Sequence, residues 1–328
     1  MTGTALVRRV TGGSITDTPE RIDLLEAWYA GKSAHTVAGY KADLERFAEW
    51  AGEPSATAAL VRLMSAPHGA ANATVMRYRG AMLEAKIASA TINRRLGALR
   101  SVVKLARGLG YIDWQIETPG VESQPYRDTR GPGLDLARRM VQTLREDPSP
   151  KAVRDHALIR LMLDMGLRRA ECVGLDLAHY DAEARTLSIL GKKRSDREKL
   201  TVPEPTAAAL NAWVAARGRK AGPLFVNLDR RTLKTLTDAD ETQPLPRLTG
   251  RSVARNVVAK AAQRAGITVA VRPHGLRHTA ITHALDMGRD MRDVAKFSRH
   301  RSLQTLVVYD DNRQDKQGEV AGAVATAW

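Results

Sequence analysis

Residues 273–309 of this chain read PHGLRHTAITHALDMGRDMRDVAKFSRHRSLQTLVVY, and the spacing of the charged and aromatic side chains in this stretch guides the interpretation of the whole sequence. Pro273 marks the start of a helix, because proline fits the first helical turn. His274 and Arg277 are three residues apart, so they share one helix face near an N-terminus that favours an anion. Two more histidines follow, but without the acidic or thiol ligands of a motif such as H-E-x-x-H, so no metal site is predicted.

The same stretch ends with a histidine and a tyrosine. His300 precedes Tyr309 by nine residues, and Val307 and Val308 come directly before the tyrosine. Taken alone, a tyrosine after two valines is typical of a core or an edge position. Its interpretation therefore depends on the clusters that lie upstream.

One upstream cluster is Gly166-Leu167-Arg168-Arg169-Ala170-Glu171. On a helix, Arg168 and Glu171 would share a face and could hold each other in one orientation. An ordinary surface ion pair is the simpler interpretation of this pair by itself.

A second upstream cluster is a predicted β-hairpin with a cationic tip. Two short strand-like runs, Thr186–Leu190 and Lys199–Val202, bracket the turn-like residues 191–198. The tip carries three cations: Lys192, Lys193 and Arg194. A lysine there could reach a DNA groove, protonate a leaving oxygen, or simply bind phosphate.

Together these clusters supply what phosphodiester transfer requires. A phosphoryl centre with extra negative charge needs cations at its non-bridging oxygens, a nucleophile held in line, and an acid for the leaving 5′ oxygen. Paired metals held by carboxylates supply those cations in many nucleases, and the sequence contains no such carboxylate cluster. A G-x-x-x-x-G-K-[S/T] segment is also missing, so neither a metal nor an ATP step is predicted.

The charge of the chain agrees with a nucleic-acid partner. Its 51 Lys and Arg residues against 36 Asp and Glu give +15, with a pI near 10.2. Residues 1–125 contribute 15 basic and 12 acidic side chains, whereas the remainder contributes 36 and 24. Such an excess attracts polyanions, although a basic but otherwise ordinary surface is an equally good interpretation of charge alone.

Cysteine content and hydropathy limit the setting. Cys172 is the single cysteine, so one chain can form neither a disulfide nor a thiol-based metal site. The sequence contains no apolar run of the roughly 18–20 residues that cross a bilayer. Polar residues follow Arg8 and Arg9 where a signal peptide would be apolar. A cytoplasmic, nucleoid-associated protein is expected.

The N-terminal part is predicted to be a small helical bundle. Residues 1–17 resemble a loose arm, too short for a separate arm-binding domain, and residues 18–118 form the bundle. Ser33 or Thr36 caps one of its helices. Apolar side chains recur at helical spacing: Ile22, Leu25 and Trp28; Val37, Tyr40, Leu44 and Phe47; Ile92, Leu96, Leu99, Val103 and Ala106. A basic edge lies beside the last stripe, suited to phosphates or simply to solvent: Arg100, Lys104 and Arg107.

The rest of the chain is predicted to be a second domain. Residues 119–133 contain prolines and glycines without helical or alternating periodicity, which is typical of a linker. Residues 134–328 combine helices with the hairpin. Their Ala- and Val-rich tail, Gly318–Trp328, is expected to form an apolar helix. The expected fold class is mainly α with a small β component.

The order Arg, Lys, His-x-x-Arg, His, Tyr resembles the tyrosine recombinase family, which includes phage integrases and Xer-like proteins. The four motifs cover about the last 200 residues, a usual domain size. The segment Ser33-x-x-Thr36-Val37-x-x-Tyr40 is similar to the family's core-binding (SAM-like) domain. The resemblance implies a helical core-binding domain and a mixed α+β catalytic domain that form a clamp around DNA.

The resemblance also implies roles for individual residues. Arg168 and Arg277 would clamp the phosphate and His300 would contact it as well. His274 would accept a proton from the nucleophile or hydrogen-bond to it, and Lys192 would protonate the 5′ oxygen. Tyr309 would become the 3′-phosphotyrosine. Glu171 would support the site from behind.

The sequence departs from the family pattern at three places. Ser298-Arg299 precedes His300 where the family usually has Leu-Gly, and Thr305-Leu306 stands where two threonines are common. Lys193 replaces the second glycine of Gly-Lys-Gly in the hairpin, so Lys192 and Lys193 both remain candidates for the acid.

The resemblance implies partners as well as chemistry. Four protomers would assemble on two double-stranded DNA sites and exchange strands through a Holliday junction, with possible accessory proteins. The tail helix would dock in a neighbouring protomer or pack on its own domain. A type IB topoisomerase and a DNA-binding protein without catalysis are the competing interpretations. Element integration, chromosome-dimer resolution and transposition stay open, and so does the target sequence.

Overall fold

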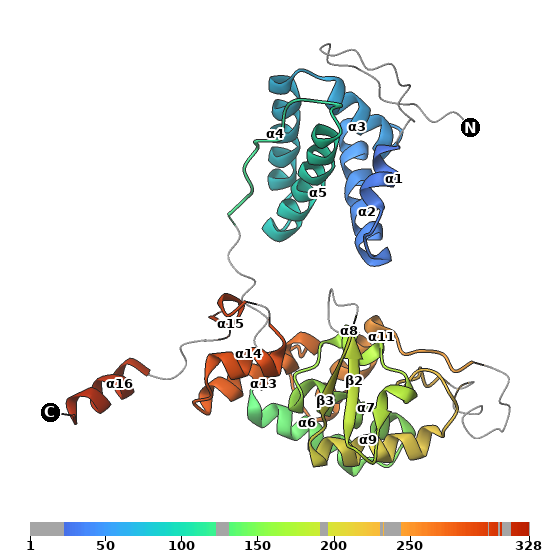
Figure 1. The fold of residues 1–328 in the computed structure, drawn as a ribbon, viewed down its shortest axis with the longest axis vertical. Helices are drawn as coiled ribbons and strands as arrows, with labels where there is room; N and C mark the ends of the chain where they lie inside the picture. The colour runs from blue at the N-terminus through green and yellow to red at the C-terminus, as the bar shows by residue number, and fades with distance from the viewer. Residues whose placement is uncertain are drawn as a thin grey trace. The chain divides into compact units, whose positions relative to one another are not determined.

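The chain divides into two compact units, Met1–Tyr126 and Arg127–Trp328 (Figure 1). The computed structural model describes residues 23–122, 131–190, 196–229, 232, 244–300, 302–307, 309 and 316–327. The division falls inside the range 119–133 that the sequence marks as a linker. The predicted N-terminal arm lies outside the described residues.

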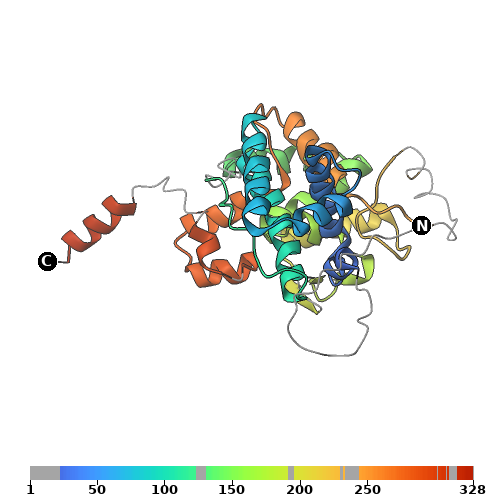
Figure 2. The ribbon, with the colours of Figure 1, turned by 90° about the horizontal axis from the view of Figure 1, so that it is seen from above.

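All regular secondary structure in the described part of unit 1 is helical, in agreement with the sequence. Its elements are α1 (Leu24–Tyr29), α2 (Ala34–Ala51), α3 (Ala56–Ser65), α4 (His68–Glu84) and α5 (Ser89–Gly108). Ser33 caps α2 by accepting a hydrogen bond from the backbone N–H of Thr36, so the first of the two candidate caps is the correct one. Helix α2 packs against both α3 and α5 (Figures 1 and 2).

The apolar stripes of unit 1 meet in one core. Leu44, Phe47, Ile92 and Leu96 are buried, as predicted. The Trp28 ring stacks on Tyr40 with a centroid distance of 4.6 Å, and its indole N–H donates to Ser101 Oγ at 2.9 Å. Helices α3 and α4 were not predicted individually, although α4 carries the helical spacing of a buried face: Ala71, Val75, Tyr78 and Met82.

Two asparagines hold the end of unit 1 against its helices. Asn93 on α5 accepts from the Val121 N–H and donates to the Val121 carbonyl, each at 2.8 Å. Asn72 on α4 accepts from the Glu117 N–H at 2.7 Å. The first residues of the predicted linker are therefore fixed to unit 1.

Unit 2 combines helices with one small sheet. The helices are α6 (Leu134–Glu146), α7 (Pro150–Asp164), α8 (Arg169–Val173), α9 (Glu204–Arg217), α11 (Gly250–Ser252), α12 (Ala259–Arg264), α13 (Pro273–Asp286), α14 (Met291–Ser298), α15 (Gln304–Val307) and α16 (Lys316–Ala325). A 3₁₀ turn, η2 (Leu177–His179), precedes the sheet, and a π-helical segment, η3 (Val253–Val258), joins α11 to α12.

The sheet is antiparallel with the order β1-β2-β3: β1 (Tyr180–Asp181), β2 (Thr186–Leu190) and β3 (Arg197–Thr201). Strands β2 and β3 pair from Thr186↔Thr201 to Leu190↔Arg197, which confirms the predicted hairpin. The sequence did not predict β1, which has only two residues. The hairpin tip, residues 191–195, lies outside the described residues.

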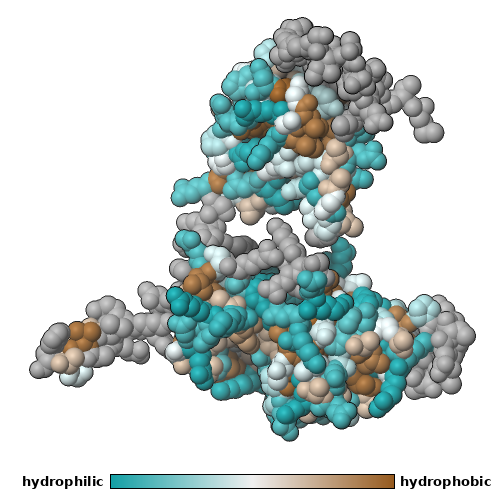
Figure 3. Space-filling view, in the orientation of Figure 1, coloured by the Kyte–Doolittle hydropathy of each residue, from teal (hydrophilic) through white to brown (hydrophobic). Residues whose placement is uncertain are grey.

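The core of unit 2 surrounds α7, which packs against α6, α9 and α13. Leu158, Ile159 and Leu161 of α7 are fully buried, as is Trp213 of α9. Hydrophilic residues cover most of the visible surface of both units, with scattered hydrophobic patches (Figure 3). Mainly helical packing with one small sheet is the fold class that the sequence predicted.

Candidate phosphoryl-transfer site

One hydrogen-bonded network in unit 2 joins three of the predicted site residues. Arg277, on the first turns of α13, donates to the carbonyls of Gly166 and Ser298 and lies 3.3 Å from His300 Nε2. Arg168 donates to the Arg299 carbonyl at 3.3 Å. Segments more than 100 residues apart in the sequence thus converge on the turn that follows α14.

The buried guanidinium of Arg277 is the centre of this network. Arg277 is 1% exposed, and its Nε has no hydrogen-bond partner among the residues that the structure describes. Burial, and then the neighbouring Arg168 and Arg299, lower the pKa of Arg277 to about 10. The group therefore remains a cation at neutral pH, held in place by carbonyl oxygens.

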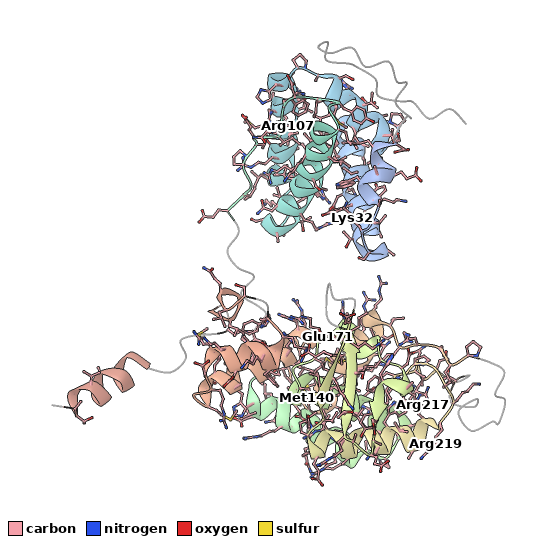
Figure 4. The ribbon with its side chains drawn as sticks, viewed as in Figure 1. Lys32, Arg107, Met140, Glu171, Arg217 and Arg219 are labelled. Carbon is pink, nitrogen blue, oxygen red and sulfur yellow. The ribbon has the colours of Figure 1, made fainter. Side chains whose placement is uncertain are left out.

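Arg168 and Glu171 form the predicted pair, but at a helix start rather than along a helix. Arg168 is the N-cap of α8, and Glu171 accepts from its N–H at 2.7 Å and from its Nη1 at 2.9 Å. Burial raises the pKa of Glu171, but Arg299 and the hydrogen bonds from Arg168 outweigh it, so the net shift is downward. Glu171, labelled in Figure 4, is thus a buried carboxylate that orients an arginine.

Tyr309 lies against three histidine rings. Its hydroxyl is 3.5 Å from His274 Nε2, and its ring centroid is 4.8 Å from that of His278 and 5.5 Å from that of His300. The residue is 5% exposed and belongs to a small apolar cluster with Ile281 and other side chains of α13 and α14. The predicted nucleophile and its predicted base are therefore neighbours.

The two site histidines are neutral at pH 7. Partial burial, and then Arg277 and Arg168, lower the pKa of His274. The same causes, in the same order, lower the pKa of His300 to about 4. A neutral His274 can accept a proton from a tyrosine hydroxyl.

The hydrogen bonds of Ser298 show which ring nitrogen of His300 carries the proton. Its Oγ donates to the Val294 carbonyl at 2.6 Å, and His300 Nδ1 lies 2.8 Å from that same Oγ. Because a hydroxyl has one hydrogen, His300 donates through Nδ1, and its Nε2 accepts from Arg277.

Some predicted residues lie elsewhere. Lys192, Lys193 and Arg194 fall outside the described residues. Arg100, Lys104 and Arg107 are on α5 in unit 1, where Lys104 is exposed. Arg100 donates to the Thr118 carbonyl at 2.5 Å and Arg107 to Gln115 Oε1 at 3.2 Å, so both also bind the chain segment that follows α5.

Sequence reasoning missed the part that Ser298 and Arg299 play in this network. Arg299 adopts the left-handed conformation, with φ of 55°, at the end of α14. Glycine is the usual residue there, so the pattern offered no signal for a buried arginine. His278 and Thr282, which contact Tyr309, were also missed. They follow His274 by four and eight residues and so share its helix face, which was the available signal.

Three exposed arginines lie on α8 and on the α11–η3 segment packed beside it: Arg169, Arg251 and Arg255. A Cβ added to Gly250 would lie 3.1 Å from Arg169 Nε, so the two helices touch at this point. Arg168, one of the predicted site residues, is the neighbour of Arg169 in sequence. Positive charge therefore extends from the site onto the adjoining surface.

The described residues contain neither a helix suited to span a membrane nor a cluster of metal ligands. None of their helices combines the length and the apolar composition that crossing a membrane requires. No three His, Cys, Asp or Glu side chains among them gather closely enough to hold a metal ion.

The chain belongs to the phage integrase family, whose model matches residues 135–316. More particularly, it is similar to proteins named as tyrosine recombinases, enzymes that cleave and rejoin DNA in site-specific recombination. It is 36% identical over 289 residues to tyrosine recombinase slr0733 of Synechocystis sp., covering 87% of this chain and 88% of that protein. It is 30% identical over 312 residues to tyrosine recombinase XerC of Corynebacterium efficiens, covering 90% of each.

Solved structures share the fold at lower identity. The XerH site-specific recombinase bound to palindromic difH substrate matches with a TM-score of 0.65 and 17% identity, covering 88% of this chain and 79% of that one. A lambda integrase dimer (residues 75–356) bound to a COC′ core site matches with a TM-score of 0.63 and 13% identity, covering 89% and 94%.

Proposed function

We propose that this chain recombines specific DNA sites in the cytoplasm through a 3′-phosphotyrosine intermediate formed by Tyr309. The observation that carries the proposal is the position of the Tyr309 hydroxyl, 3.5 Å from His274 Nε2 and beside the Arg168–Arg277–His300 network. A nucleophile, a neutral base and fixed cations are then within reach of one phosphate.

In the cleavage step the tyrosine hydroxyl gives its proton to His274 Nε2 while its oxygen attacks the phosphorus. The P–O5′ bond breaks, and Lys192 protonates the departing 5′ oxygen; Lys193 is the competing acid. The phosphodiester energy stays in the tyrosine ester, so attack by a 5′ hydroxyl reverses the step without ATP. The arginines supply the positive charge, so the proposed reaction requires no metal.

The phosphate is proposed to enter beside Arg168, whose side chain is 28% exposed, and to reach Arg277 and His300 behind it. In the ligand-free network His300 Nε2 accepts from Arg277, so it has no proton to donate to a phosphate oxygen. The anion raises the pKa of His300 from its low starting value. His300 then gains a proton and donates through Nε2.

The DNA backbone is proposed to contact cations on both units. In unit 2 these are the exposed Arg169, Arg251 and Arg255, together with Lys193 and Arg194 of the hairpin tip. In unit 1 they are Arg100, Lys104 and Arg107 of α5. Such contacts hold DNA in register without reading its sequence.

Assembly is proposed to use the tail helix α16. An apolar groove of about 750 Å³ between α6, α7, α13 and α14 is lined by side chains such as Leu134, Val141, Ala284, Met287 and Phe297. The described end of α16 is exposed and apolar, with Val324 52% exposed. The proposed occupant of this groove is α16 of a neighbouring protomer. The assembly would be a tetramer that holds two DNA sites and exchanges their strands through a Holliday junction.

Docking in trans predicts a concentration-dependent effect. Val324→Asp should weaken assembly on DNA by at least about tenfold, because a charge enters an apolar contact. Analytical ultracentrifugation on DNA measures it, with Met287→Asp as the partner variant and Arg292→Gln as control. Unchanged assembly together with lower stability of the isolated protomer would instead place α16 on its own domain.

Tyr309→Phe tests the chemistry. A DNA duplex recovered from a random pool by binding to the protein is the probe, and covalent attachment is followed on a denaturing gel. The Phe variant should bind this duplex as the parent does and form no adduct, because it lacks the attacking oxygen. An adduct with the Phe variant would refute the nucleophile assignment, and efficient relaxation of a supercoiled plasmid without this site would favour a topoisomerase.

A further inference from the structure

We propose that Arg299 is a positioning residue that fixes Glu171 and Arg168 in the geometry needed for phosphoryl transfer. This inference rests on the proposed function and names a residue to which that function assigns no step.

Arg299 occupies a backbone conformation that disfavours its side chain. It is the C-cap of α14, with φ of 55° and ψ of 41°. A residue with a Cβ is disfavoured in this region, which is why glycine usually fills it. Something in the folded protein must therefore compensate for an arginine here.

The compensation is a set of hydrogen bonds made by a buried guanidinium. Nη1 donates to the carbonyls of Phe297 at 3.0 Å and Met165 at 3.4 Å. Nη2 donates to the Gly166 carbonyl at 3.1 Å and to Glu171 Oε2 at 3.0 Å. The side chain is 6% exposed, so these bonds are protected from water.

Two of these four acceptors are shared with the other arginines of the site. Gly166 O also accepts from Arg277, and Glu171 also accepts from Arg168. The Arg299 carbonyl, on the same residue, accepts from Arg168. Arg299 thus links both phosphate-clamping arginines through two shared acceptors and its own carbonyl.

Arg299 differs from Arg168 in what it can reach. Arg168 is partly exposed, whereas the Arg299 guanidinium is enclosed by carbonyls and a carboxylate. It therefore acts through Glu171 rather than on the substrate. Its charge also helps to lower the pKa values of Arg277 and His300.

The planar geometry of the Arg299 guanidinium matters as well as its charge. Four acceptors on three segments are met by two nitrogens of one planar group. A lysine would bring one point charge and three donors that radiate from one nitrogen, so it cannot reproduce this pattern. Arg299→Lys should therefore fail to restore what Arg299→Gly loses.

The test measures single-turnover adduct formation by the full-length protein on the duplex selected for the Tyr309→Phe experiment. Arg299→Gly removes the guanidinium and suits the left-handed backbone, so this variant should fold. At saturating DNA its adduct should form about 10- to 100-fold more slowly, because the clamping groups are misplaced, while DNA affinity changes less than about threefold. Arg299→Lys should be similarly slow, and Arg292→Gln on the exposed side of the same helix should match the parent.

A double variant shows whether Arg299 acts through the carboxylate. If it does, Arg299→Gly combined with Glu171→Gln should be no slower than Glu171→Gln alone. A parent-like rate for Arg299→Gly, full rescue by lysine, additive losses in the double variant, or loss of cooperative unfolding would each overturn the assignment. Failure of the proposed function looks different, because the parent itself would then form no adduct.

Discussion

The two units differ in how much charge they bury. Among the described residues of unit 1, the buried charged side chain is Asp43, paired with Arg94 and Arg95. The described part of unit 2 buries more: Arg154, Asp155, Glu171, Arg217 and Arg277, together with the side chain of Arg299. Burying a charge is costly unless it is paired or hydrogen-bonded. The core of unit 1 is formed mainly by apolar helix faces, whereas the core of unit 2 also holds charged side chains in fixed positions.

Burial alone does not identify a functional arginine within unit 2. Arg217, at the end of α9 (labelled in Figure 4), is as deeply buried as Arg277. Its donors meet the carbonyls of Pro223, Gly218 and Lys220, all in the turn that follows its own helix. Arg277 instead joins segments far apart in the sequence and contacts His300. The hydrogen-bond partners of a buried arginine, rather than its burial, therefore distinguish a structural arginine from one proposed to act on the phosphate.

Replacing each of these two arginines by lysine should separate their roles most clearly. Arg277→Lys should reduce the rate of adduct formation by about 10²–10³-fold, as loss of one preorganised donor typically does. Arg217→Lys should leave the rate of the folded protein unchanged and cost about 1–3 kcal/mol of stability, because buried carbonyls lose their donors. Single-turnover cleavage and urea unfolding measure the two effects. Equal losses of rate would show that burial itself is what matters.

Two glycines of the linker region, Gly120 and Gly131, differ in how much space a larger side chain would find, and the expected effects of replacing them are smaller. A Cβ on Gly131 would overlap Thr279 Oγ1 and the Gly275 carbonyl of α13 and would lie 2.9 Å from the Thr279 N. A Cβ on Gly120 would lie 2.8 Å from Asn93 Oδ1, the end of a side chain that can shift.

Gly131→Ala should therefore destabilise unit 2 by about 1–3 kcal/mol through overpacking against a helix backbone, and should slow cleavage because α13 carries Arg277. Gly120→Ala should cost about 1 kcal/mol at most and leave cleavage intact. Thermal unfolding and single-turnover cleavage of the full chain measure both. A larger loss for Gly120→Ala would contradict the view that the backbone contact is decisive.

The sequence predicted the elements with strong periodicity and the residues with distinctive spacing. The α5 stripe, the β2–β3 hairpin and the start of α13 at Pro273 lie where the patterns placed them. Strand β1 was not predicted, because its two residues are too few to show the alternation typical of a strand. The contacts of Arg299 were not predicted, because they join residues more than 100 positions apart, and helical or strand periodicity does not encode such contacts.

The smallest expected contrast is in the response of stability to pH. Burial raises the pKa of Asp43, and Arg94 and Arg95 oppose it only in part. A raised carboxyl pKa contributes stability at low pH that is lost as pH rises through the folded pKa. Glu171 has the opposite shift: its contribution is present above its unfolded pKa of about 4.3 and is lost as pH falls.

Neutral replacements should therefore give slopes of opposite sign when stability relative to the parent is followed from pH 7 to about pH 3, a range that extends below the unfolded pKa values of both carboxyls. Relative to the parent, Asp43→Asn should become less stable as pH falls, because only the parent gains from protonation. Glu171→Gln should become relatively more stable, because only the parent loses its ionised carboxylate. Urea unfolding at several pH values measures both, and slopes of the same sign would mean that the two units do not hold their buried carboxyls in opposite electrostatic environments.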